Sequence, residues 1–105
     1  MIELGCGWGC WMNITGVAAR RAGLDVHLIG VEGDAAHIAL AYEATDANGF
    51  QPAQVALHHG IASAYPGVAL FPRQDRTDPH GGSWDLHPIF DQRRNPRRGK
   101  AKWQP

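Results

Sequence analysis

The stretch Glu3-Leu4-Gly5-Cys6-Gly7-Trp8-Gly9 decides how the rest of this sequence is interpreted. It follows the apolar residue Ile2 and places three glycines at alternate positions, which is typical of a strand that turns tightly into a helix. Glycine permits the positive φ angles of such a turn and lets a ligand approach the backbone closely. The helix that follows directs unpaired N–H groups toward the same point. Because an ordinary glycine-rich turn also fits the motif, its meaning depends on the surrounding sequence.

Two helices are expected after this turn. The first runs from Trp8 or Gly9 to Ala22, and the second begins at its N-cap Asp34 and runs to about Asn48. Apolar residues three or four positions apart define the predicted inward faces: Trp11, Ile14, Ala18 and Ala22 on the first helix, and Ile38, Tyr42 and Thr45 on the second.

Three stretches are predicted to be strands: residues 1–4, 25–31 and 54–62. The order is therefore β-α-β-α-β, an α/β fold with a partial Rossmann-like parallel sheet. A further apolar run at residues 68–71 suits a C-terminal hairpin. Right-handed crossovers are expected to place the first strand between later partners. Ligands of such sheets bind beyond the carboxyl ends of the strands, where residues 5–9, 32–34 and 60–62 fall.

Composition limits the class of protein. The 105 residues suffice for one domain with a modest core. Net charge is zero, but residues 1–92 hold four arginines and all ten acids (4 − 10 = −6), whereas residues 93–105 hold six basic residues and no acid. Two cysteines make no secreted disulfide framework, and no apolar run approaches transmembrane length. We therefore expect a cytoplasmic protein without a membrane partner.

The sequence divides into three parts. Residues 1–72 carry the strand and helix pattern, residues 73–92 are expected to be irregular, and residues 93–105 are expected to form a basic, disordered tail. Hardly any strand precedes the glycine turn, and no fourth parallel strand is evident after Pro72. We therefore expect an incomplete domain whose unpaired first strand favours self-association.

An acid at the end of the second strand has a clear chemical use. Carboxylate oxygens accept hydrogen bonds from both hydroxyls of a ribose. Glu32 lies 23 residues beyond Gly9 (32 − 9 = 23), close to the spacing of nucleotide-binding β-α-β units. The alternative is that Glu32 merely ends a strand or caps a helix.

Two segments together, Ile2-Glu3-Leu4-Gly5-Cys6-Gly7-Trp8-Gly9 and Gly30-Val31-Glu32-Gly33-Asp34, resemble the first two motifs of class I S-adenosylmethionine-dependent methyltransferases. The continuation through residues 37–48, 55–62 and 67–72 is similar to the FkbM branch of that superfamily. Rossmann dehydrogenases instead carry Gly-x-Gly-x-x-Gly, so the third glycine at position 9 favours the methyltransferase interpretation.

The resemblance implies that S-adenosylmethionine binds at the strand ends and that its methyl group passes to a small-molecule or glycan acceptor, commonly at a hydroxyl. Glu32 would hold the ribose, Gly33 and Asp34 would pass beside the adenine, and Gly60, Ile61 and Ala62 would form the other wall. The methionine part would lie against Glu3, Gly5, Cys6, Gly7, Trp8 and Gly9. No catalytic residue is identified. An alternative of a different class is a noncatalytic nucleotide-binding or protein-interaction module of Rossmann type.

Several other residues have two interpretations. His58 and His59 could supply a general base or form a polar pair at a strand end. Trp8 could cover the cofactor or pack on the first helix, and packing is the preferred interpretation for Trp11. The two cysteines are interpreted as small buried residues, and we expect no metal site. The basic tail has one aromatic residue and no folded recognition element, so we expect no nucleic-acid partner.

Overall fold

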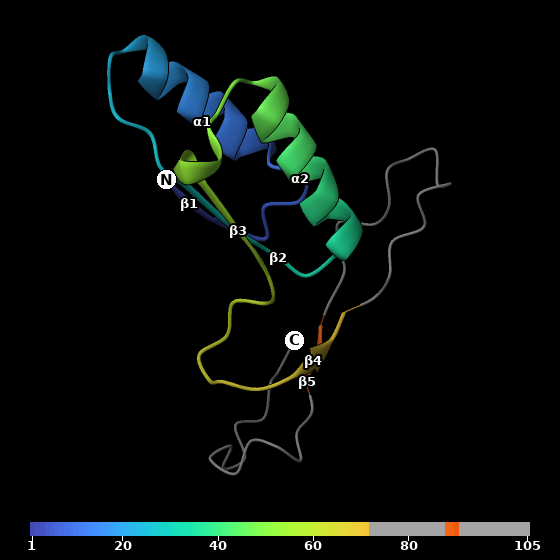
Figure 1. Cartoon of the computed structure of the whole chain (residues 1–105). Helices are drawn as coiled ribbons and strands as arrows, with labels where there is room; N and C mark the ends of the chain where they lie inside the picture. The colour runs from blue at the N-terminus through green and yellow to red at the C-terminus, as the bar shows by residue number, and fades with distance from the viewer. Residues whose placement is uncertain (72–87, 91–105) are drawn as a thin grey trace.

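The computed structural model describes residues 1–71 and 88–90. Strand β1 (Ile2–Leu4) leads to helix α1 (Cys10–Arg21), strand β2 (Leu28–Glu32) and helix α2 (Ala35–Ala47), as Figure 1 shows. A short 3-10 helix, η1 (Pro52–Gln54), precedes strand β3 (Val55–His59). Strands β4 (Ala69–Leu70) and β5 (Ile89–Phe90) pair antiparallel. The predictions for residues 73–87 and 91–105 lie outside the described residues.

The first three strands form a parallel sheet in the order β1-β2-β3. Ile2 aligns with Ile29 and Leu28 aligns with Val55, so both pairings join residues 27 positions apart (29 − 2 = 27; 55 − 28 = 27). The partial Rossmann-like α/β fold is therefore confirmed. The position expected for β1 was wrong within the described sheet, because crossovers that all proceed in one direction leave the first strand at an edge.

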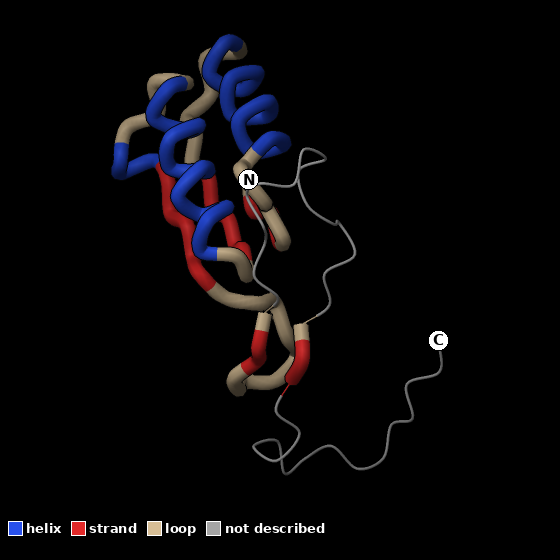
Figure 2. Tube along the Cα trace, turned by 90° about the vertical axis from the view of Figure 1, so that its right-hand side faces the viewer, coloured by secondary structure: helices blue, strands red, loops and turns tan. Residues whose placement is uncertain are grey.

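Both helices cover the same face of the sheet (Figures 1 and 2). The alternate β2 residues Leu28, Gly30 and Glu32 are buried on that face. A Cβ built on Gly30 would lie 2.8 Å from Cys6 Sγ and 3.0 Å from Met12 Sδ, so only glycine allows this close packing. On the opposite face of the described sheet, Ile2 and Leu4 remain exposed.

The buried face of α1 differs from the prediction. Met12, Asn13 and Gly16 are buried, whereas Trp11, Ile14, Ala18 and Ala22 are exposed. The helix lies so close to the core that a Cβ on Gly16 would be 2.7 Å from the Phe50 ring. Asn13 tolerates burial because its Nδ2 donates to the Gly9 carbonyl at 2.7 Å and its Oδ1 accepts from Asn48 Nδ2 at 3.0 Å. The spacing of apolar residues does not identify a buried helix face that includes a glycine and an asparagine.

The prediction for α2 was partly right. Asp34 is its N-cap, and Asp34 Oδ1 accepts the Ala36 N–H at 2.8 Å. Thr45 is buried as expected, but Tyr42 is 49% exposed, and Ala41 takes the buried position instead. A side chain as small as alanine fits there because α2 packs against the glycine turn, with the Ala41 Cβ 3.6 Å from a Cβ built on Gly9.

Candidate ligand site at the strand ends

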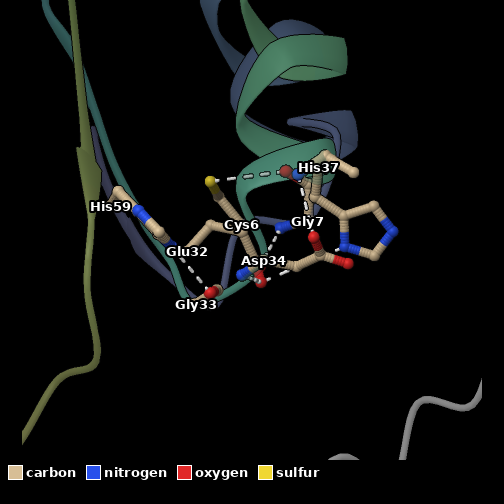
Figure 3. Close-up of polar contacts among 8 residues, drawn as sticks. Cys6, Gly7, Glu32, Gly33, Asp34, His37 and His59 are labelled. Atoms are coloured by element: carbon tan, nitrogen blue, oxygen red, sulfur yellow. Dashed lines mark hydrogen bonds and ion pairs between the residues drawn. The ribbon is translucent and has the colours of Figure 1, made fainter. Parts of the chain in front are cut away.

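The residue that joins the three predicted segments is Glu32 (Figure 3). Its Oε2 accepts the Gly7 N–H at 2.7 Å and its Oε1 accepts the Asp34 N–H at 2.9 Å. Its backbone carbonyl accepts the Gly60 N–H at 2.9 Å. The structure therefore brings together residues 5–9, 32–34 and 60–62 at the carboxyl ends of β1, β2 and β3, and we call this region the strand-end site.

The turn between β1 and α1 is fixed by its backbone. The N–H groups of Gly5 and Cys6 both donate to the Val31 carbonyl, at 2.7 and 3.0 Å. Gly5, Gly7 and Gly9 have φ angles of 72°, 54° and 85°, in the left-handed region that favours glycine. Among the described residues, nothing lies within 4 Å of a Cβ built on Gly5 or Gly7. Conformation rather than crowding requires glycine there, and the open space lets a ligand approach the turn.

Glu3 caps α1 from the neighbouring strand. The N-cap residue Gly9 has no side chain to accept a hydrogen bond, and Glu3 Oε2 accepts the Met12 N–H at 3.0 Å. A carboxylate at this end also interacts favourably with the helix dipole. Burial raises the pKa of the Glu3 carboxyl above its ordinary value of 4.5, and the hydrogen bond from Met12 opposes this rise. Contact of Glu3 with the methionine part of a ligand stays a prediction.

Sequence interpretation missed His37. From the first turn of α2, its Nδ1 lies 4.0 Å from Glu32 Oε1 (Figure 3). The sequence could have indicated this position. His37 is the third residue after the N-cap Asp34, so it lies one helical turn from the end of β2. An imidazole at this position faces one of the oxygens by which Glu32 holds the site together.

The two carboxylate oxygens of Asp34 have different surroundings. The residue is 6% exposed, and its Oδ1 caps α2, whereas its Oδ2 has no hydrogen-bond partner within the described structure. A buried carboxylate oxygen without a donor is costly and calls for an explanation, such as a ligand or water that supplies one. Asp34 therefore offers acceptor capacity at the strand-end site.

A cavity of about 720 Å³ opens beside this site. It is lined by Gly33, His59, Gly60 and Ile61, by residues 63–71 and by Phe90. The other predicted site residues, the glycine turn and Ala62 included, lie outside this lining. Both His58 and His59 are exposed, and the His59 Nε2 lies 2.9 Å from the Gly33 carbonyl, which ties the end of β3 to the end of β2.

Cys6 belongs to the glycine turn, and the residue is 5% exposed. Burial, followed by the nearby charges of Glu32 and Glu3, raises the pKa of the Cys6 thiol from 9.0 to about 11. This supports the interpretation of Cys6 as a small packed residue rather than a reactive one. Cys10 is half-buried, and Trp8 is 45% exposed. The 65% exposure of Trp11 contradicts the packing role expected for it, because α1 turns its Met12 side toward the core.

Residues 1–71 and 88–90 contain no group of three or more His, Cys, Asp or Glu residues placed to hold a metal ion. No helix within those ranges has the length and apolar character needed to cross a membrane.

Comparison with curated proteins finds 47% identity over 90 residues to a protein of Jannaschia sp. (strain CCS1) named "Putative methyltransferase". The match covers 86% of this chain and 31% of that protein, so the chain spans about a third of the length of the relative it matches. No family model matches the chain, and no solved structure matches it.

Proposed function

We propose that this chain provides the S-adenosylmethionine-binding part of an FkbM-like methyltransferase. The observation that carries the proposal is the position of Glu32, whose carboxylate lies at the end of the middle strand and bonds to both the glycine turn and Asp34. Nucleotide-binding folds of this type bind ribose with an acid that follows the glycine turn by about 20 residues. The name of the Jannaschia relative adds support for methyl transfer.

The residues of the strand-end site suit this cofactor. Each carboxylate oxygen of Glu32 has more than one acceptor position, so its bonds to Gly7 and Asp34 leave capacity for ribose hydroxyls. The Oδ2 of Asp34, which has no hydrogen-bond partner among the described residues, is a second buried acceptor. Gly33 and Ile61 line the cavity, where they would flank the adenine. The open side of the glycine turn, with Glu3, Cys6, Trp8 and Gly9, would take the methionine part.

Bound S-adenosylmethionine would supply a methyl group on a sulfonium for transfer to a hydroxyl of a small molecule or glycan. The chain itself would hold this donor in a fixed orientation. Alignment of reacting atoms supplies much of the acceleration of a displacement reaction. The hydrogen bond from Gly7 to Glu32 suits this task, because it ties the turn to the ribose-binding acid.

A noncatalytic nucleotide-binding module is the second candidate. It is favoured by the structural contacts of the three acids at the strand ends: Glu3 caps α1, Glu32 holds the glycine turn and Asp34 caps α2. Acids engaged in this way serve binding and stability more readily than proton transfer.

Isothermal titration with S-adenosylmethionine and S-adenosylhomocysteine tests the proposal. We expect the chain to bind both ligands and Glu32→Ala to lose binding. Glu43→Ala removes an exposed acid of α2 and should bind like the original chain. Absence of binding heat with both ligands would contradict the proposal. Binding without transfer of a labelled methyl group to hydroxyl-bearing acceptors would favour the second candidate.

A further inference from the structure

An aromatic ring lies against the backbone at the end of β2. Phe71 follows β4 and is half-buried. A Cβ built on Gly33 would lie 2.5, 2.7 and 2.8 Å from three atoms of the Phe71 ring. The ring therefore rests directly on the Gly33 backbone, in a space that only a residue without a side chain leaves free.

The proposed function assigns the same space to the adenine. Gly33 and Ile61 are the residues expected to flank the base, and both line the cavity together with Phe71. A purine and a phenyl ring are both flat and aromatic, so either can cover a glycine backbone with an apolar face. They cannot both lie on Gly33 at once.

We propose that the Phe71 ring blocks the base-binding part of this cavity in the free chain, because it occupies the place of the base until an aromatic base displaces it. This inference rests on the proposed function. An aromatic base has to displace the ring from Gly33, whereas a ligand without a base can bind while the ring stays in place. A molecule in which the ring covers Gly33 cannot bind a base there. The apparent affinity for a ligand with a base is therefore reduced in proportion to the fraction of molecules in which Gly33 is uncovered.

Titration of three proteins with two ligands tests this. The proteins are the original chain, Phe71→Ala and the control Leu24→Ala, which removes a side chain that is 63% exposed and lies outside the cavity lining. The ligands are S-adenosylhomocysteine, which has a base, and S-methylmethionine, a sulfonium amino acid without one. If the ring covers Gly33 in about nine molecules of ten, Phe71→Ala should bind S-adenosylhomocysteine about tenfold more tightly. Leu24→Ala should match the original chain, and S-methylmethionine should show no difference among the three.

Two further measurements guard against a merely structural effect. Phe71→Leu keeps an apolar side chain without the ring and should also bind S-adenosylhomocysteine more tightly. The α-proton NMR signals of Gly33 should be displaced by the ring in the free original chain. That displacement should be absent in free Phe71→Ala and should change in the original chain when S-adenosylhomocysteine saturates it, because the base replaces the ring.

The outcomes separate the two proposals. Equal or weaker binding of S-adenosylhomocysteine by Phe71→Ala than by the original chain would overturn the role of Phe71 and leave the proposed function standing. Failure of all three proteins to bind S-adenosylhomocysteine would overturn the proposed function and this inference with it.

Discussion

Glu32 accepts the N–H of Gly7 at 2.7 Å, and this hydrogen bond joins residues 25 positions apart. The turn presents the N–H because Gly7 adopts a φ of 54°, and the acceptor is available because Glu32 ends the adjacent strand. The glycine motif and the acid are therefore parts of one unit. The acid holds the turn in shape, and the turn helps to orient the acid.

Glu32→Gln is expected to lower the free energy of unfolding by about 1–3 kcal/mol, because one buried acceptor oxygen becomes an NH2 group that faces an N–H donor. Chemical denaturation at neutral pH measures the change. Glu43→Gln alters an exposed acid on α2 and should stay within about 0.5 kcal/mol of the original chain. Equal stabilities of the two variants would show that the hydrogen bonds of Glu32 contribute little.

Glu3→Ala is expected to destabilise the chain by about 1 kcal/mol, the usual cost of losing an N-terminal helix cap. Glu3→Gln keeps an oxygen that can accept the Met12 N–H and should cost less. Thermal unfolding followed by circular dichroism compares the two variants. If they lose the same stability, the negative charge rather than the hydrogen bond is responsible.

The raised pKa of Cys6 predicts a change of stability in alkaline solution. The folded state keeps the thiol proton up to about pH 11, whereas the unfolded chain loses it near pH 9.0. The free energy of unfolding should therefore not depend on this group below pH 9. Above it the free energy should fall, by at most about 1.4 kcal/mol per pH unit, until the folded state also ionises.

Denaturant titrations between pH 7 and pH 11 check this prediction. Cys6→Ala should remove part of the alkaline decline, and Cys10→Ala, the matched control, should retain it. An identical decline in the original chain and in Cys6→Ala would contradict the assignment to Cys6.

Gly30→Ala is expected to cost about 1–3 kcal/mol, because the added methyl group would overlap side chains of the core. Its Cβ would lie 2.8 Å from both Cys6 Sγ and Leu57 Cδ2. Gly67→Ala is the control, since nothing within the described structure lies within 4 Å of a Cβ there. Differential scanning calorimetry should show a lower melting temperature for the first variant alone. A melting temperature unchanged by Gly30→Ala would mean that the core shifts freely to admit a methyl group.

The parts of the site that follow from local chemistry could be predicted from the sequence. A glycine turn, an acid at a strand end and an aspartate N-cap each depend on a few neighbouring residues. The buried face of α1 could not be predicted, because Gly16 and Asn13 are buried through partners elsewhere in the chain, Phe50 and Asn48.

The contact of Phe71 with Gly33 was missed for the same reason, because it arises only when separate segments come together in three dimensions. The contact of His37 with Glu32 is local in the sequence and could have been predicted from the N-cap. Hydrophobic periodicity reports how an element divides its own faces between apolar and polar residues. It does not report which partner requires a small or polar residue on the buried side.

The equal spacing of the two strand pairings has a consequence for how the chain folds. Both pairings of the parallel sheet join residues 27 positions apart, so the chain closes two loops of the same length. The entropic cost of closing a loop grows only with the logarithm of its length, and neither closure requires β1 to find β3 directly. The sheet can form in two steps of the same kind, each of which pairs a new strand with the preceding one. Parallel sheets usually fold slowly because their contacts join residues far apart in the sequence. The sequential strand order limits that separation here.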